Sequence, residues 1–435
     1  MRLRPRALTV IAAVAFLAAV APAGAATPPG FTNHQAPAPL GRDAGEPSIG
    51  VNDVSGATLF QAGLQTLKVD FSGPTTTWED VSSPLTNKET LDPILFTDHA
   101  TGRTFVSQLY GVCSLMAFSD DDGKTWTNNP LGCGAGSLVD HQTLGGGPFH
   151  AGTLQPVGAY PHAVYYCAQA IVSAQCSLSP AGGLAFGPGV PIYDLTRCGG
   201  LHGHLKTAPD GTVYVPNADC GGKAAVVRSA DNGLTWTIDA VPDSSTQDES
   251  DPSVGLGQDG TAYLGYQGKD GHAYVATKPP GAGAWTKSVD VGAGLGLQNI
   301  QFPAVVAGDG DRAAVAFHGT TTAGDDQAAS FAGVWHLYVA STYDRGATWS
   351  TVDATPSDPV QKGCIWLGGG SNPCRNLLDF MDATADKQGR ILVAYADGCT
   401  GACATGGANT RTAIATIARQ SAGTGVRAAY DGTLG

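Results

Sequence analysis

Residues 119–126 have the sequence Ser-Asp-Asp-Asp-Gly-Lys-Thr-Trp, and this stretch decides the fold because it recurs twice. The second copy, at 229–236, is Ser-Ala-Asp-Asn-Gly-Leu-Thr-Trp, and the third, at 342–349, is Thr-Tyr-Asp-Arg-Gly-Ala-Thr-Trp. An aspartate two residues before a glycine predicts a turn capped by the carboxylate, with glycine at positive φ. The Thr-Trp that follows favours a strand anchored by a large aromatic side chain. Each copy therefore predicts a hairpin turn, and Asp121, Asp231 and Asp344 are committed to these turns rather than to catalysis.

A second, looser repeat marks the starts of successive β-rich segments. The residues at these starts are Glu46, Asp92, Asp140, His202, Asp251, Phe302 and Phe380. Four of the six intervals are 46 to 51 residues long, and a Cys-containing insertion at about 355–376 lengthens the last one. The aspartates of the three turns lie 110 and 113 residues apart, which is about two such intervals.

These repeats predict an all-β fold, a seven-bladed β-propeller of four-stranded antiparallel blades. Residues 251–291 show the pattern of one blade best, with turn signals at Asp259-Gly260 and Asp270-Gly271 between the strands. Helical periodicity is nearly absent after the N-terminus. Six blades is the alternative if the third start is misplaced. We expect the last blade to be completed by residues 31–40 or by residues 426–430.

The N-terminus has the features of a secretory signal peptide over residues 1–26. Arg2, Arg4 and Arg6 precede an apolar stretch over 7–20, and small residues follow at 23–26. The apolar stretch is shorter than a typical membrane span. We therefore expect a secreted, extracellular protein without membrane insertion, whose residues 27–435 form a single propeller domain.

The cysteines agree with an extracellular location, and the net charge limits the possible partners. There are ten cysteines, an even number that suits an oxidising compartment, and they fall in five close pairs. Sequential pairing predicts the disulfides Cys113–Cys133, Cys167–Cys176, Cys198–Cys220, Cys364–Cys374 and Cys399–Cys403. The net charge of −13 argues against nucleic acid and anionic membranes as partners, because both need positive charge. A monomer is expected.

The three turns resemble the Asp-box (bacterial neuraminidase) repeats of sialidases and other secreted carbohydrate-active propellers, and the resemblance spans most of residues 40–420. It implies a carbohydrate or glycoconjugate partner and an exo-sialidase-like glycoside hydrolase activity. Sialidases bind the sugar carboxylate with three arginines, for which Arg42, Arg197 and Arg375 are the candidates here. Sialidases typically have six blades and an Arg-Ile-Pro motif, whereas Arg42 is followed by Asp43-Ala44. Asp boxes also occur in polysaccharide lyases and in binding propellers.

The polar residues at the strand starts are the best candidates for the chemistry. Strands of a propeller converge on a central channel, so these residues should meet at its mouth. The catalytic candidates are Asp92, Asp140, His141, His202, His204 and Asp251. Glu249 and Gln301 join the arginines as candidates for substrate binding.

Three functions compete for these residues. Paired carboxylates hydrolyse glycosides, and their separation sets retention or inversion of configuration. A histidine base with an arginine near a uronate carboxylate would instead suit a polysaccharide lyase. The third alternative is a propeller that binds a glycan or a protein without catalysis. No cofactor is required by the sequence, although Asp140, His141, His202 and His204 are also candidates for holding calcium or zinc at the mouth.

Overall fold

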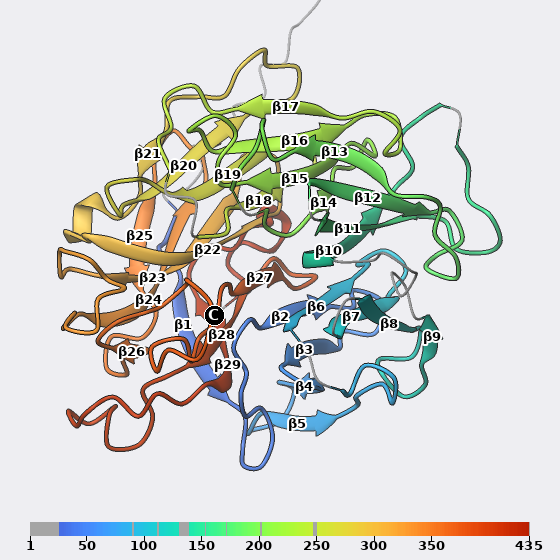
Figure 1. The fold of residues 1–435 in the computed structure, drawn as a ribbon. Helices are drawn as coiled ribbons and strands as arrows, with labels where there is room; N and C mark the ends of the chain where they lie inside the picture. The colour runs from blue at the N-terminus through green and yellow to red at the C-terminus, as the bar shows by residue number, and fades with distance from the viewer. Residues whose placement is uncertain are drawn as a thin grey trace, which may run out of the picture.

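The structure is a computed structural model that describes residues 26–88, 91–110, 113–129, 139–152, 154–170, 172–200, 202–246 and 250–434. Seven antiparallel sheets stand in a ring and form a seven-bladed β-propeller, which confirms the predicted fold class and blade number (Figure 1). The predicted signal peptide falls almost wholly outside the described residues.

The first three blades follow one another along the chain, each running from its innermost to its outermost strand. Blade 1 comprises β2 (Ser48–Val51), β3 (Thr58–Ala62), β4 (Gln65–Asp70) and β5 (Thr77–Asp80). Blade 2 comprises β6 (Leu91–Thr97), β7 (Thr104–Tyr110), β8 (Cys113–Ser119) and β9 (Thr127–Asn129). Blade 3 comprises β10 (Val139–Gly147), β11 (Ala163–Ala170), β12 (Ser173–Ser179) and β13 (Val190–Asp194).

The next three blades have the same strand order. Blade 4 comprises β14 (Lys206–Thr207), β15 (Val213–Asn217), β16 (Ala225–Ser229) and β17 (Thr237–Ala240). Blade 5 comprises β18 (Ser253–Leu256), β19 (Ala262–Gln267), β20 (Ala273–Lys278) and β21 (Val289–Asp290). Blade 6 comprises β22 (Asn299–Ala307), β23 (Ala313–Thr320), β24 (Val334–Thr342) and β25 (Ser350–Asp353). Short 3-10 helices occupy Ala293–Leu295 and Ala428–Tyr430.

Blade 7 joins the two ends of the chain. It comprises β27 (Asp382–Ala385), β28 (Ile391–Asp397), β29 (Ile414–Ala422) and, as its outermost strand, β1 (Gly30–Gln35). β1 pairs antiparallel with β29, and the blue strand lies beside the red ones in Figure 1. Of the two closures that the sequence predicts, the one through the N-terminal segment is therefore the observed one.

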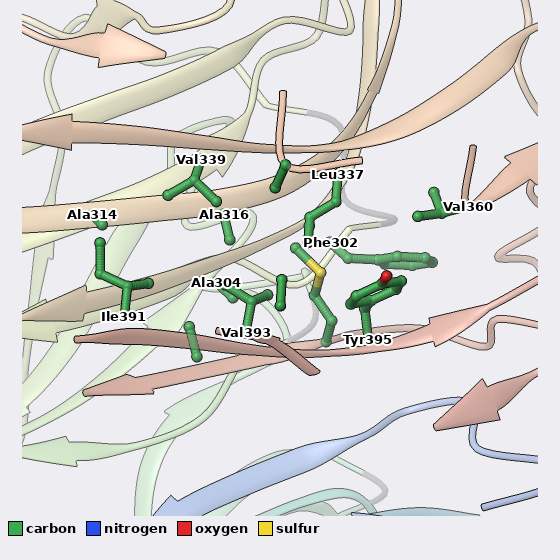
Figure 2. Packing of buried hydrophobic residues seen from close by; sticks show 14 of the residues in the cluster. Phe302, Ala304, Ala314, Ala316, Leu337, Val339, Val360, Ile391, Val393 and Tyr395 are labelled. Atoms are coloured by element: carbon green, nitrogen blue, oxygen red, sulfur yellow. The ribbon is translucent and has the colours of Figure 1, made fainter. Parts of the chain in front are cut away.

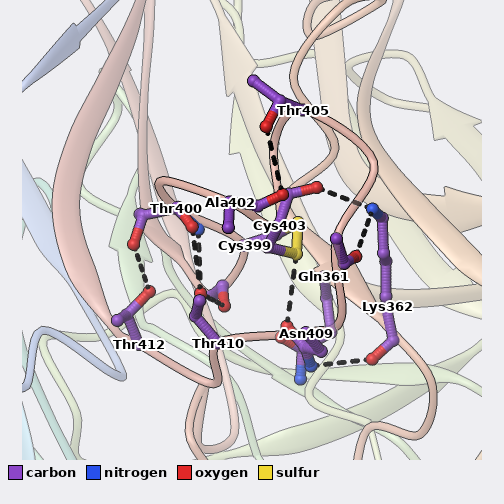
Figure 3. The surroundings of a disulfide bond; sticks show 12 residues. Gln361, Lys362, Cys399, Thr400, Ala402, Cys403, Thr405, Asn409, Thr410 and Thr412 are labelled. Carbon is purple, nitrogen blue, oxygen red and sulfur yellow. Dashed lines mark hydrogen bonds between the residues drawn. A yellow bond between two sulfur atoms is a disulfide. The ribbon is translucent and has the colours of Figure 1, made fainter.

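The predicted insertion after blade 6 packs against that blade. Its strand β26 (Gln361–Lys362) pairs with Val334 and Trp335 of β24. Lys362 then reaches the loop between β28 and β29, where its ammonium donates to the carbonyls of Cys403, over 2.6 Å, and Gly407, over 3.0 Å (Figure 3). The insertion and this loop of blade 7 thus support each other.

Four of the five predicted disulfides are present: Cys167–Cys176, Cys198–Cys220, Cys364–Cys374 and Cys399–Cys403. The fifth predicted pair includes Cys133, which lies outside the described residues. Three of these disulfides join parts of one loop or hairpin, whereas Cys198–Cys220 joins the segment before blade 4 to the turn between β15 and β16. Among the described residues, no helix has the length and apolar character needed to cross a membrane.

The hydrophobic core lies between the blades. Between blades 6 and 7, the side chains of Phe302 and Leu337 pack against those of Val393 and Tyr395 (Figure 2). Trp335, in the same cluster, is completely buried. Similar clusters join the other blades, so sheet-on-sheet burial of apolar surface holds the ring together.

The repeat of blades gives the propeller two different faces. Every innermost strand runs in the same direction, so all seven begin on one face, called here the strand-start face. The three repeated turns connect the third and fourth strands of blades 2, 4 and 6 and therefore lie on the opposite face.

The aspartate of each repeated turn is bound within its own turn, as predicted. In the second copy, Asp231 accepts the backbone N–H of Thr235 over 2.9 Å and the Thr235 hydroxyl over 2.5 Å. Asp121 and Asp344 make the corresponding contacts with Thr125 and Thr348. These aspartates are structural.

The residue after each of these aspartates has positive φ and contacts the preceding blade. Asp122 accepts a hydrogen bond from Asn52 of blade 1 over 2.7 Å. Asn232 accepts from the backbone of His150 in blade 3 over 2.8 Å, and Arg345 pairs with Asp259 of blade 5 over 2.8 Å. The repeated turns therefore also connect neighbouring blades.

Candidate functional site

Left-handed backbone geometry recurs where the innermost strands begin. Glu46, Asp92, His141 and Phe302, from blades 1, 2, 3 and 6, have φ of 56°, 48°, 50° and 59°. For Asp92, His141 and Phe302 the residue lies in a β-bulge of the innermost strand. Non-glycine residues rarely adopt this conformation, and it is concentrated at functional sites. The bulge turns these side chains out of the regular alternation of the strand.

Three of these residues are linked from blade to blade by hydrogen bonds. The backbone N–H of Asp92 donates to Glu46 Oε2 over 3.2 Å, and the backbone N–H of His141 donates to Asp92 Oδ2 over 3.1 Å. The imidazole of His141 then contacts both oxygens of Asp251, in blade 5, at 2.9 and 3.1 Å. Asp140 joins through its Oδ1, which accepts the same His141 N–H over 3.0 Å.

Blade 7 adds Asp379 and Arg375 to this chain of contacts. Glu46, Asp92 and Asp379 place carboxylate oxygens within 4.8 Å of one another. Arg375 holds Asp379 through two nitrogens, at 2.5 and 2.7 Å. Arg375 is itself fixed by the insertion, because it donates to the carbonyl of Leu367 and lies next to the Cys364–Cys374 disulfide. We call Glu46, Asp92, Asp140, His141, Asp251, Arg375 and Asp379 the polar cluster.

Burial shifts the proton affinities of the polar cluster. Burial, followed by the charges of Asp92 and Asp379, raises the pKa of Glu46 well above its usual value. Burial also raises the pKa of Asp92, to about 6. Burial alone would lower the pKa of His141, but Asp251 and then Asp92 raise it well above its ordinary value. Glu46 therefore keeps its proton to a higher pH than a free glutamate does, and His141 stays charged to a higher pH than a free histidine does.

Of the two remaining histidine candidates, His202 lies against the cluster and His204 lies against Phe380 and Asp382. The ring of His202 stands edge-on to that of His141 at 5.8 Å, and burial lowers the pKa of His202 to about 3. The ring of His204 packs against Phe380 at 4.5 Å, and its Nδ1 lies 4.0 Å from Asp382. Burial also lowers the pKa of His204. Both rings are therefore neutral at neutral pH.

The candidates for substrate binding are not all in one place. Arg375 is in the polar cluster, whereas Arg197 is exposed in the turn that follows β13, close to Asp194. Within the part of the chain that the structure describes, no ion pair or hydrogen bond connects Arg42 or Arg197 to the cluster, so their role stays a prediction. Gln301 is buried in blade 6 and donates to Asp326 over 2.9 Å. Glu249 lies outside the described residues.

A cavity of about 530 Å³ occupies the central channel, between the cluster and the face of the repeated turns. Inner-strand residues of all seven blades line it, and His204, Lys206 and Asp382 lie at its inner end. The cavity extends from there to His99, His162 and Arg427, near the face of the repeated turns. The cluster and the cavity are therefore different places, because none of the cluster residues lines the cavity.

The cluster also has the donor set of a cation site. Asp92, Asp140 and His141 each offer one ligand atom, and these atoms lie within 4.8 Å of one another. Oxygen and imidazole ligands suit calcium and zinc respectively. His202 and His204 are not part of this group, which differs from the four-residue set expected from the sequence.

The sequence predicted Arg375 as a binding residue but gave no specific role to two other members of the site, Glu46 and Asp379. Glu46 is one of the strand-start residues, but nothing in the sequence distinguishes it from the other starts until its contact with Asp92 is seen. The Arg375–Asp379 pair spans four residues in the chain, and only the fold shows that it meets Glu46. The Glu-Pro at 46–47 and the Asp-Pro at 92–93 are the shared signal that points to both strand starts.

Neither a protein-family model nor a curated protein matches this chain. Solved structures do resemble it. The GH74 enzyme of Niastella koreensis matches with a TM-score of 0.51 at 15% identity, over 87% of this chain and 55% of that one. The intramolecular trans-sialidase from Ruminococcus gnavus matches with a TM-score of 0.40 at 12% identity, over 86% and 93%. The Aleuria aurantia lectin matches with a TM-score of 0.41 at 11% identity, over 70% and 88%.

These similar structures comprise glycan-active enzymes and glycan-binding lectins. At such low identities the similarity shows the propeller fold alone. The resemblance of the three turns to Asp boxes remains a sequence-based prediction.

Proposed function

We propose that this protein is a secreted glycoside hydrolase that cleaves a glycosidic bond at the polar cluster. One observation carries the proposal: Glu46, a buried acid whose pKa is raised, lies against two further carboxyl groups, Asp92 and Asp379, at the channel mouth. Glycoside hydrolysis needs such a pair, one carboxyl group protonated and the other ionised. The four disulfides of the described residues suit the oxidising space outside the cell.

Glu46 is the proposed general acid. It gives its proton to the oxygen of the leaving group as the bond from that oxygen to the anomeric carbon breaks. Asp92, ionised above a pKa of about 6, forms the new bond to the anomeric carbon. Water then releases the sugar, and Glu46 takes the proton from that water, which restores both groups.

The spacing of the carboxyl groups favours retention of configuration. Oxygens of Glu46, Asp92 and Asp379 lie within 4.8 Å of one another. Retaining enzymes hold their two carboxyl groups about 5–5.5 Å apart, whereas inverting enzymes leave about 6.5–9.5 Å for a water molecule. His141, held by Asp251, contributes positive charge beside Asp92 and keeps its carboxylate oriented.

A glycan-binding propeller without catalysis is the second candidate. The observation in its favour is that the cluster carboxylates already accept hydrogen bonds inside the protein, as Glu46 does from Asp92 and Asp379 does from Arg375. Carboxylates that already accept hydrogen bonds within the protein keep the strand-start face rigid. A rigid face suits glycan recognition as well as catalysis.

The test compares wild type with Glu46→Gln and Asp92→Asn on a panel of chromogenic aryl glycosides that includes an α-sialoside. Asparagine tolerates left-handed φ, so the second variant preserves the local backbone. We expect each variant to lower kcat at least about 100-fold, because each removes an acid–base or nucleophilic group. Glu79→Gln, at an exposed glutamate of β5, is the control and should retain the wild-type rate.

The pH dependence of kcat adds a readout that a structural role would not produce. The wild-type rate should fall below about pH 6, where Asp92 becomes protonated, and again at high pH, where Glu46 loses its proton. An unchanged rate in Glu46→Gln would remove that residue from the mechanism. Glycan binding without cleavage of any bound glycan would favour the second candidate. An unsaturated product from a polyuronate would indicate the lyase alternative.

A further inference from the structure

A second polar pocket lies on blade 5, away from the polar cluster. It has a volume of about 580 Å³ and is lined by Asp243, Ser245, Tyr266, Lys269, Asp270, Tyr274, Lys287 and Ser288. Residues 243–246, which follow β17, form one wall: the N–H of Lys269 donates to the carbonyl of Ser245 over 2.8 Å, and Thr246 pairs with Gly268. The turn between β19 and β20 is on the strand-start face, so this pocket opens on the same face as the cluster.

Two tyrosines form the aromatic part of the pocket. Tyr266 on β19 and Tyr274 on β20 stand directly opposite each other across the strand pair. Their rings are stacked, with centroids 5.8 Å apart and planes inclined by 22°. Tyr266 is buried, whereas Tyr274 is half-buried. The partly exposed ring of Tyr274 therefore gives the pocket an aromatic surface, and the buried ring of Tyr266 supports it.

Hydrogen bonds fix the polar groups around these rings. The Tyr266 hydroxyl donates to Ser288 over 2.6 Å, and the Tyr274 hydroxyl donates to Asp270 over 2.9 Å. Asp243 accepts from both the N–H and the hydroxyl of Ser288, each over 2.9 Å. Side chains tied down in this way lose little entropy when a ligand binds.

The pocket still has hydrogen-bonding capacity for a ligand. Each carboxylate oxygen has more than one acceptor position, so Asp243 and Asp270 can accept further hydrogen bonds. Lys287 is exposed and offers an ammonium donor. Closely spaced acceptors and a donor around an aromatic surface match a pyranose ring, which has hydroxyl groups at its edge and C–H groups on its face.

We propose that this pocket binds a pyranose unit of a glycan, as an accessory subsite distinct from the polar cluster. The inference rests on the proposed function for its ligand class, a glycan presented at the strand-start face. Asp243 and Ser245 of the pocket precede Asp251 of the cluster by only a few residues in the sequence. The pocket and the candidate site are therefore connected by a short stretch of chain. A longer glycan contacts both places, whereas a small aryl glycoside contacts only the cluster.

The experiment measures binding by isothermal titration to lactose, cellotetraose, sialyllactose and trigalacturonate. These four probes cover neutral, sialylated and uronate sugars. Tyr274→Ala removes the half-buried ring, and Lys287→Ala removes the exposed ammonium with little effect on folding. Tyr110→Ala, at an exposed tyrosine of β7, is the matched control. For a probe that wild type binds, we expect Kd at least tenfold weaker in Tyr274→Ala, severalfold weaker in Lys287→Ala and unchanged in Tyr110→Ala.

The outcomes separate this inference from the proposed function. Cleavage of aryl glycosides at the wild-type rate by Tyr274→Ala, together with weaker oligosaccharide binding, supports both. Unchanged oligosaccharide binding in both Tyr274→Ala and Lys287→Ala overturns the subsite and leaves the proposed hydrolase standing. No binding of any of the four probes by wild type overturns the subsite as well, whereas loss of the hydrolase would be seen in the aryl glycoside assay.

Discussion

The backbone N–H of Asp92 donates to the side chain of Glu46 over 3.2 Å, so a strand start of blade 2 is bound to a strand start of blade 1. The backbone N–H of His141 repeats this contact one blade further, with Asp92 as the acceptor. Side chains that look like catalytic groups are therefore also the contacts that set the relative positions of three blades. Any change at Glu46 or Asp92 has to be interpreted with both roles in mind.

The part of the stability that comes from Glu46, Asp92 and His141 should fall as the pH rises, whereas the buried neutral rings of His202 and His318 contribute in the opposite direction. Glu46, Asp92 and His141 each have a pKa that is raised in the folded state. Such groups contribute stability that is complete below the pKa of the unfolded chain, about 4 for the acids and 6.5 for histidine, and lost as the pH passes the folded pKa. Thermal unfolding of wild type and of Asp92→Asn between about pH 4 and 6 checks the direction, because the variant lacks the loss of stability that Asp92 contributes.

Asp397 provides a variant for the same measurement outside the cluster. Burial raises its pKa to about 7, and its side chain accepts from Gln35 of β1 over 2.9 Å. Asp397→Asn removes its titration, so the loss of stability between about pH 4 and 7 should be smaller than in wild type. An equally steep fall in the variant would show that Asp397 is ionised normally in the folded protein.

Breaking a repeated turn should reduce stability without reducing activity. Asp231→Ala removes the acceptor for the N–H and the hydroxyl of Thr235, and we expect a loss of roughly 1–2 kcal/mol by analogy with other side-chain caps. Denaturant unfolding gives the value. Asp311→Ala, at an exposed aspartate on the same face, is the control and should change the midpoint by less. A lost activity in Asp231→Ala would contradict the purely structural role.

Divalent cations test the donor set of Asp92, Asp140 and His141. If this set holds calcium or zinc, adding the ion to protein treated with a chelator should raise Tm by several degrees, because a ligand of the folded state stabilises it. Asp140→Ala, which removes an exposed member, should abolish the increase. The same increase in wild type and in Asp140→Ala would place the ion elsewhere.

The fold was predictable because its signals are local. The strand starts indicate where each blade begins, and the three turns mark the last hairpin of blades 2, 4 and 6. The interval from Asp92 to Asp140 is one blade length, and it is visible in the sequence without knowledge of the fold. The same register predicted that the strand starts would meet, and His141 contacts both Asp92 and Asp251, whereas the roles of these residues stay predictions. The sequential disulfides followed from spacing in the same way.

The rest of the site depends on contacts that have no local signal. Asp379 reaches Glu46 only because blade 7 closes against blade 1, and Arg375 joins them because the insertion folds over blade 6. His202 and His204 are two residues apart in the sequence, but their rings lie in different places. The ring of His202 lies beside His141, and that of His204 lies beside Phe380. Spacing alone does not determine which of them lies at the cluster.

The closing strand β1 is made early in synthesis but can pair only late. Its partner β29 lies almost at the other end of the chain, and Thr27 bonds to Thr424 across a separation of 397 residues. A chain emerging N-terminus first therefore carries β1 unpaired until β29 has been made. The ring closes only then, and contacts this distant in sequence are the ones that slow folding most. In this propeller, the strand that is made first is the one that finds its partner last.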